Sequence, residues 1–193
     1  FHTTKDVGMY TVALAIPKLI ANIPNQISLI LYPYISALKV KQAALNLTSL
    51  IVKTSTMISI LLYIPILIWG SELITFIYGE QYGGLNLPLK ILFVAMILDG
   101  IGSLIFNHFA GQGKPIYGSY KFIISISVLV VGGFFIIPQF GVSGAAFIKL
   151  LSAFCASTFI VFLFVRENSI INTFFIRALD IKLFKQIIRQ EIR

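Results

Sequence analysis

Five long apolar runs occupy most of this chain, at residues 8–38, 45–69, 85–109, 118–137 and 140–165. Each is long enough to cross a bilayer as a helix, which takes about 20 mostly apolar residues. Backbone polar groups cannot stay unpaired in lipid, so such runs form either helices or a closed barrel. Barrel strands are short and alternate in polarity, whereas residues 58–69 and 123–137 show no alternation. The sequence therefore predicts an all-α integral membrane protein with about five transmembrane helices.

Composition excludes an ordinary soluble domain. Hydrophobic residues make up 58% of the chain and charged residues 11%, against about 25% charged residues in soluble domains. The net charge of +8 is concentrated on alternate connections between the runs and after the last run, starting with Lys39, Lys41, Lys114 and Arg166, and Lys121 lies just inside the fourth run. The positive-inside rule places these positions in the cytoplasm, so the C-terminus is expected to be cytoplasmic. Because these basic residues are spread along one membrane face, the sequence does not predict nucleic-acid binding.

Residues 167–193 differ in character from the five runs. Basic residues surround apolar residues that recur at helical spacing: Ile171, Phe174, Phe175, Ala178, Ile181, Phe184, Ile187 and Ile188. This pattern predicts an amphipathic helix on the anionic inner leaflet, and the alternative is a docking helix for a partner enzyme. The expected organisation is a transmembrane bundle over residues 1–166 and a basic cytoplasmic tail over 167–193. Because the chain starts at Phe1 without a signal peptide, we expect further helices upstream.

Polar side chains lie well inside the first run. Lys18, Asn22 and Asn25 fall at i, i+4 and i+7, with Gln26 adjacent, so they follow one helix face. Lys18 lies about ten residues from the outer end, which is ~15 Å at 1.5 Å per residue. A charge at such depth costs about 2.5 kcal/mol or more, and is kept where it faces a cavity, a partner or a pathway. We interpret the four residues as a cavity lining for an anionic substrate. The alternative is bonding to neighbouring helices, with Lys18 paired to an acid.

Two more charges lie inside later runs. Lys149 is about eight residues into the fifth run and is a second candidate cavity cation. Asp99 is the only acid in any run, and it has two possible roles. It could form a structural ion pair with Lys18 or Lys149, or it could take up a proton or sodium ion that drives a conformational change. Lys53, near the cytoplasmic end of the second run, is expected to extend its ammonium to the interface, and Lys90 is expected to do so on the other side.

The first run also contains Pro17, Pro24 and Pro33. Each proline removes a backbone hydrogen bond and favours a kink, so we expect a helix broken at three places. Interrupted helices beside buried polar residues are typical of transport sites. The glycines at 132–133 and in the segment 141–146 are interpreted as positions of close helix packing.

Enzyme motifs are not found. The chain has no metal-ligand spacing of histidines, no paired carboxylates and no glycine-rich phosphate loop, and residues 111–115 (GQGKP) predict a turn. We therefore expect no enzyme, no catalytic residues, no metal and no cofactor beyond a coupling proton or sodium ion. A membrane enzyme of polysaccharide assembly remains an alternative. It would need large outer loops with catalytic residues, and Glu72 and Glu80 are the candidates there.

Five short motifs occur in a consistent order: residues 7–13 (VGMYTVA), 31–36 (LYPYIS), 77–82 (IYGEQY), 110–115 (AGQGKP) and 137–146 (IPQFGVSGAA). This succession resembles the polysaccharide-biosynthesis exporters, the O-antigen flippases of the multidrug/oligosaccharidyl-lipid/polysaccharide superfamily. The resemblance covers residue 7 to about residue 166 and is to the C-terminal half of these proteins.

The resemblance implies a 12-helix transporter of two lobes in the cell inner (cytoplasmic) membrane, with this chain supplying the last five helices of the second lobe. It implies alternating access that moves a polyprenyl-diphosphate-linked oligosaccharide, of O-antigen or capsule type, between leaflets. The implied partners are lipid-linked oligosaccharide, membrane lipids, and a polysaccharide polymerase or glycosyltransferases. The alternative within the superfamily is a multidrug and toxin extrusion-type, cation-coupled exporter. Such a protein would be expected to line its cavity with acids, whereas lysines outnumber Asp99 inside these runs.

Overall fold

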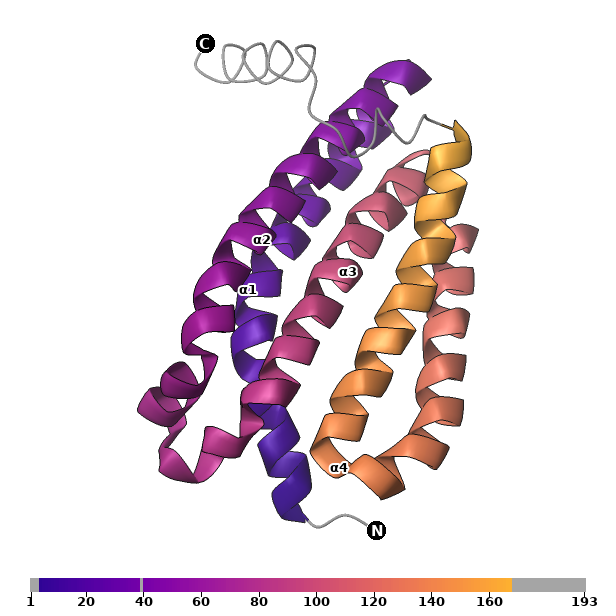
Figure 1. The fold of residues 1–193 in the computed structure, drawn as a ribbon. Helices are drawn as coiled ribbons and strands as arrows, with labels where there is room; N and C mark the ends of the chain where they lie inside the picture. The colour runs from indigo at the N-terminus through magenta and orange to yellow at the C-terminus, as the bar shows by residue number, and fades with distance from the viewer. Residues whose placement is uncertain (1–3, 39, 168–193) are drawn as a thin grey trace.

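The computed structural model describes residues 4–38 and 40–167 of the chain. Its elements are α1 (Thr4–Ala37), α2 (Lys41–Tyr78), the 3-10 helix η1 (Glu80–Leu85), α3 (Asn86–Gly111) and α4 (Ile116–Glu167) (Figure 1). These residues contain no strand. The stretches Lys41–Tyr78, Glu80–Gly111 and Ile116–Glu167 are long and apolar enough to cross a membrane. The predicted all-α membrane fold is confirmed, while the predicted tail helix lies outside the described residues, which end at Glu167.

The long helix α4 consists of two antiparallel halves. Its helical geometry is interrupted at Gly141, where φ is 55° and ψ is −131°. This left-handed backbone is easily adopted only by a residue without a Cβ atom. The chain reverses there, and Figure 1 shows the second half of α4 running back beside the first. The fourth and fifth apolar runs, 118–137 and 140–165, lie in these two halves.

The helix α2 has a kink near its C-terminal end. Trp69 has non-helical dihedral angles (φ −112°, ψ 22°), and Pro65 lies one turn before it. Proline disturbs the turn that precedes it, and Trp69 follows Pro65, so the kink is better explained by the adjacent Gly70–Ser71 pair, a sequence at which helices often kink. The second apolar run was expected to end at residue 69, and helix continues beyond the kink to Tyr78. Gly70, next to the kink, is buried, and an added Cβ there would lie 3.1 Å from the Asn86 side chain.

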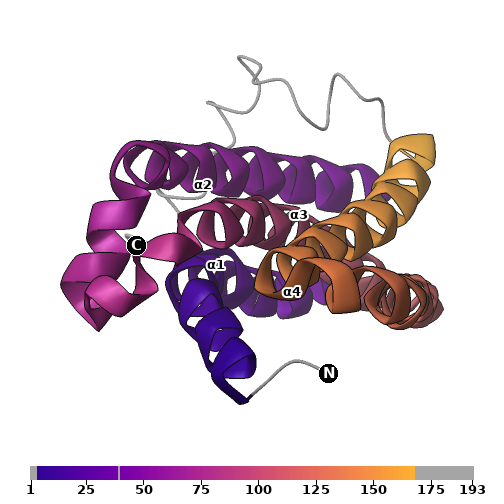
Figure 2. The same ribbon diagram turned by 60° about the horizontal axis from the view of Figure 1, so that its bottom comes forward.

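The expectation that three prolines break the first helix is wrong. α1 is one helix from Thr4 to Ala37 and passes through all three proline positions. Figures 1 and 2 show it bent along its length. A helix tolerates such prolines when neighbouring helices and local adjustments satisfy the freed backbone groups. The prolines therefore shape α1 without ending it.

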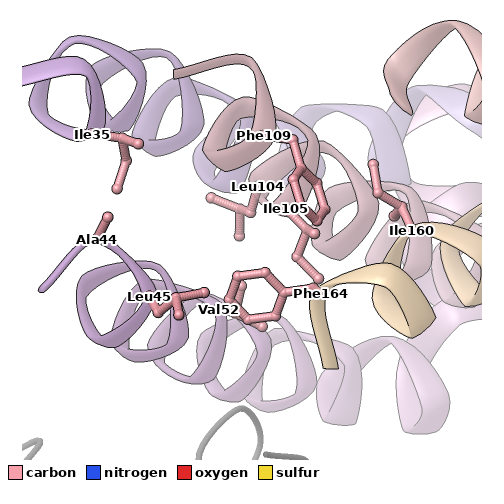
Figure 3. Close-up of a cluster of buried hydrophobic side chains, with 9 residues drawn as sticks. All are labelled: Ile35, Ala44, Leu45, Val52, Leu104, Ile105, Phe109, Ile160 and Phe164. Carbon is pink, nitrogen blue, oxygen red and sulfur yellow. The ribbon is translucent and has the colours of Figure 1, made fainter. Parts of the chain in front are cut away.

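The helix α3 is the centre of the bundle, since it packs against α1, α2 and α4. Figure 2 shows it between α2 and α1, with α4 beside it. Two buried apolar clusters surround its two ends. One contains Leu89, Leu92 and Phe93 of α3. The other, drawn in Figure 3, contains Ile35, Ala44, Leu45, Val52, Leu104, Ile105, Phe109, Ile160 and Phe164. The part of α3 between the clusters, residues 96–103, faces a polar cavity.

Candidate functional site

A cavity of about 380 Å³ lies midway along α3, between that helix, α1 and α4. Its polar lining comes from all three helices: Lys18, Asp99, Ser103, Lys121, Ser125 and Lys149. The remaining lining residues are apolar or glycine: Leu14, Ala21, Met96, Gly100 and Phe122. Three lysines and one aspartate thus line one partly open space between helices that are otherwise mainly apolar. We call this space the lysine cavity.

One of the three lysines is held by the aspartate. The Lys149 ammonium, on the second half of α4, donates a hydrogen bond to Asp99 Oδ2 on α3 at a distance of 2.5 Å. The two side chains are 21% and 28% exposed, so the pair is partly buried. The sequence left open whether Asp99 would pair with Lys18 or with Lys149, and the structure pairs it with Lys149.

Lys121 lines the cavity from the first half of α4 and is 5% exposed. Its ammonium lies against Gly102 of α3, where an added Cβ would be 3.1 Å from Nζ and 3.0 Å from the hydroxyl oxygen of Ser157. The Lys121 ammonium also lies 5.8 Å from the centre of the Phe122 ring. The absence of a side chain at Gly102 therefore leaves room for the Lys121 ammonium beside α3.

Sequence reasoning missed Lys121 because it grouped this residue with the charges of the preceding connection. A usable signal was present in the spacing, since Lys121 and Ser125 are one helical turn apart and share a face of α4. That face meets the second half of α4. The Ser125 and Ser152 hydroxyl oxygens are 2.8 Å apart, and the Ser152 hydroxyl also lies 3.0 Å from the Ser125 carbonyl oxygen, to which it donates.

The other predicted residues fall on α1. Lys18 lines the cavity and its side chain is exposed. Gln26 is exposed two turns further along the helix and is not among the lining residues. The side chains of Asn22 and Asn25 lie outside the described residues. The structure therefore places Lys18, Asp99 and Lys149, which the sequence predicted as site residues, around one cavity. Lys121 lines the same cavity.

A second polar region lies at the end of the bundle that was predicted to be cytoplasmic. Glu167 accepts a hydrogen bond from Lys114 at 2.9 Å and forms a salt bridge with Lys41 at 3.0 Å, and the two contacts join the start of α2, the α3–α4 connection and the end of α4. The hydrogen bond to Glu167 raises the pKa of the Lys114 ammonium above its usual value. Lys53 is 4% exposed in this half of α2, so the expectation that it reaches the interface is wrong.

Comparison with known proteins gives a match to one protein family. Residues 1–86 match the family model of a polysaccharide biosynthesis protein. The match covers α1, α2 and η1, including Lys18, and it confirms the resemblance to a polysaccharide-biosynthesis family. Asp99, Lys121 and Lys149 lie beyond the matched residues. No curated protein and no solved structure gave a match to the chain.

The family match and the apolar helices together indicate a multi-pass membrane protein with a role in polysaccharide biosynthesis or export. Among residues 4–38 and 40–167, no three His, Cys, Asp or Glu side chains are grouped so that they could hold a metal ion. The lysine cavity is therefore the candidate site, and its chemistry is that of ammonium groups, hydroxyl groups and one carboxylate.

Proposed function

We propose that the protein moves a polyprenyl-diphosphate-linked oligosaccharide across the cytoplasmic membrane by alternating access. The lysine cavity would hold the diphosphate group during the transfer. The observation that carries this proposal is that Lys18, Lys121 and Lys149 line one cavity between α1, α3 and α4. Cations inside membrane helices are costly and usually face a substrate or ion pathway. The match of residues 1–86 to the model of a polysaccharide biosynthesis protein supports a substrate that carries a glycan.

The sign of the charge supports an anionic substrate. Asp99 is the one acid among the described residues that line the cavity, and its carboxylate is paired with Lys149. An organic cation would meet uncompensated ammonium groups there and would be repelled. A drug exporter of the cation-coupled type is therefore a poorer fit to this cavity than a carrier of phosphates.

The size of the cavity suits a headgroup. Its volume of about 380 Å³ lies within the range of roughly 300–1,000 Å³ that is usual for small-ligand sites. The diphosphate needs charge-assisted hydrogen bonds once it leaves water, and ammonium groups supply them. The prenyl chain needs no cavity, because it can remain in the lipid beside the apolar helices.

Alternating access requires that the cavity open to one side of the membrane at a time. The two apolar clusters at the ends of α3 are the packing that would have to part for this opening. Asp99 is the candidate for coupling to an ion gradient. A proton or sodium ion on its carboxylate would weaken the ion pair with Lys149 and so loosen α3 from α4.

The test uses the full chain reconstituted in proteoliposomes. Movement of a polyprenyl-diphosphate-linked oligosaccharide between leaflets is followed with and without proton and sodium gradients. We expect protein-dependent movement that falls about tenfold or more in Lys18→Ala, while Lys90→Ala, which removes a lysine outside the cavity, stays near the starting rate. Absence of movement with several glycan types, at normal protein insertion, would overturn the proposal.

A further inference from the structure

We propose that an apolar pocket between the start of α1 and the reversal of α4 binds one zwitterionic phospholipid whose headgroup carries a primary ammonium. One acyl chain of this lipid lies in the pocket, and the ammonium lies at Asp6. The pocket shares no lining residue with the lysine cavity, so the inference goes beyond the proposed function and does not depend on it.

The pocket has a volume of about 330 Å³ and lies between α1 and both halves of α4. Figure 2 shows the turn of α4 beside the first part of α1. Two residues of α1, Asp6 and Tyr10, give the pocket its polar atoms at one end. The side chains that form the apolar walls are Val7, Leu129, Ile137, Val142, Ala145 and Ile148. We call this space the outer pocket, because the positive-inside rule places the start of α1 on the outer face of the membrane.

The outer pocket and the lysine cavity are two levels of one seam between α1 and α4. On α1, Tyr10 lines the outer pocket and Lys18, two turns later, lines the lysine cavity. On α4, Ala145 lines the outer pocket and Lys149, one turn later, lines the lysine cavity. α1 packs mainly on α3 and only lightly on α4, which leaves the seam open between them. The seam is therefore apolar at its outer level and cationic at its middle level.

The chain does not fill the outer pocket because two of its residues there are small. Gly141 has no side chain, and Ala145 follows it one turn later on the same face of α4. Walls without a neighbour lose their dispersion contacts, so an occupant stabilises them. Because α4 crosses a bilayer, the molecules that adjoin the seam are lipids. The volume of about 330 Å³ holds roughly ten methylene groups if each takes about 30 Å³, as a water molecule does in the liquid.

The headgroup is specified by the charge at the end of the outer pocket. Apolar contact alone selects no lipid, because an acyl chain in the bilayer is already in a medium as apolar as the pocket. Asp6, in the first turn of α1, is the one charged residue among the described residues of the lining. Its carboxylate can accept a charge-assisted hydrogen bond from an ammonium and repels a headgroup with net negative charge. Lys5, exposed beside it, is available to the lipid phosphate, so the two residues together match a zwitterion.

The test measures the binding of single lipids to the purified full chain by native mass spectrometry. The probes are phosphatidylethanolamine, phosphatidylcholine and phosphatidylglycerol with identical acyl chains, each titrated separately. We expect phosphatidylethanolamine to bind about tenfold or more tightly than the other two, as a hydrogen bond to a charged group implies. The quaternary ammonium of phosphatidylcholine has no hydrogen to donate, and phosphatidylglycerol is anionic. Equal affinity for the three lipids would overturn the inference.

Asp6→Asn tests the headgroup. It should remove most of the preference for phosphatidylethanolamine, while the affinity for phosphatidylcholine changes by less than about threefold. The preference is a ratio measured within one variant, so a reduced folded fraction does not imitate its loss. Glu72→Gln is the matched control, since it removes an exposed acid that does not line the outer pocket, and it should keep the preference. A full preference in Asp6→Asn would contradict the placement of the ammonium.

Ala145→Leu tests the acyl chain. The larger side chain occupies part of the outer pocket, so the affinity for all three lipids should fall about tenfold while their ratio stays the same. Val131→Leu is the matched control, because it enlarges a side chain of α4 that is 59% exposed and lies outside the pocket. Unchanged lipid affinity in Ala145→Leu would sink the inference, since another helix of the full chain or a second copy would then fill the space.

Phosphoethanolamine, which has the headgroup without acyl chains, is the last probe. It should bind at least about a hundredfold more weakly than phosphatidylethanolamine, because it makes none of the contacts with the apolar walls. Comparable affinity would identify a site for the free headgroup and would exclude an acyl chain as the occupant of the outer pocket.

Discussion

Lys149 on the second half of α4 forms an ion pair with Asp99 at the middle of α3, a residue 50 positions earlier in the chain. The pair connects the central helix to the C-terminal hairpin at the level of the lysine cavity. It has two consequences, since it fixes the α3–α4 contact and also sets the charge that the cavity presents. These two roles are separable by experiment.

The structural role predicts a coupling free energy between the two residues. Lys149→Ala should lower the free energy of unfolding by about 1–3 kcal/mol, because it leaves a partly buried carboxylate without its partner. Asp99→Ala should have a comparable effect, and the double variant should be more stable than the sum of the single effects implies. Thermal unfolding of the four proteins in one detergent measures this cycle. Strictly additive effects would show that the pair makes no net contribution.

The cavity role of Lys18 predicts a transport defect without a stability defect. Lys18 is exposed on α1, so its removal breaks no buried contact, yet it lines the cavity. Lys18→Ala should therefore leave membrane insertion and unfolding temperature close to those of the unmodified protein, while transfer of lipid-linked oligosaccharide falls about tenfold or more. Lys149→Ala should also impair transfer. Normal transfer by both variants would exclude the cavity as the substrate site.

The coupling role of Asp99 predicts a change in gradient dependence. Asp99→Asn retains the shape of the side chain but removes the group that would take up a proton or sodium ion. We expect the response of transfer to an imposed gradient to be largely lost, while some transfer without a gradient persists. The measurement is the ratio of initial rates with and without each gradient. An unchanged ratio would leave Asp99 with a structural role alone.

A side chain at position 102 is predicted to displace the Lys121 ammonium. In Gly102→Ala the new methyl group would lie 3.0 Å from Ser157 Oγ and 3.1 Å from Lys121 Nζ, so both groups must shift. We expect a loss of about 1–3 kcal/mol in unfolding free energy, the usual cost of overpacking.

The matched control for that substitution is Gly8→Ala in α1. No atom lies within 4 Å of the position that its Cβ would take. Alanine is also the better helix former, so the unfolding free energy should stay constant or rise by up to ~1 kcal/mol. If Gly102→Ala changes the unfolding free energy no more than Gly8→Ala does, Lys121 does not lie as close to α3 as the structure places it.

The fold was largely predictable because backbone polar groups in lipid must be paired within the protein, which restricts membrane-spanning segments to helices and closed barrels. The positions of the apolar runs determine where helices lie, and the turn predicted at residues 111–115 coincides with the end of α3 and the connection to α4. The continuous course of α1 was not predictable from its prolines. Whether a proline breaks or bends a helix depends on neighbouring helices, which the local sequence does not specify.

The site was predictable in part. The cost of a buried charge pointed to Lys18, Asp99 and Lys149, and all three line the cavity. The partner of Asp99 was not predictable, since it depends on how the α4 hairpin packs on α3. Lys121 and Lys53 were missed for the same reason: closeness to the end of an apolar run says little about burial when a neighbouring helix covers that end.

The reversal at Gly141 bears on how the protein enters the membrane. The two halves of α4 are joined at a single residue, and the polar groups of Ser125 and Ser152 satisfy one another within the same hairpin. Neither half has to be stable alone in lipid, because its hydroxyl groups find their partners as soon as the second half follows. We therefore expect residues 116–167 to insert into the bilayer as one unit, and a soluble tag placed at the turn should impair this insertion.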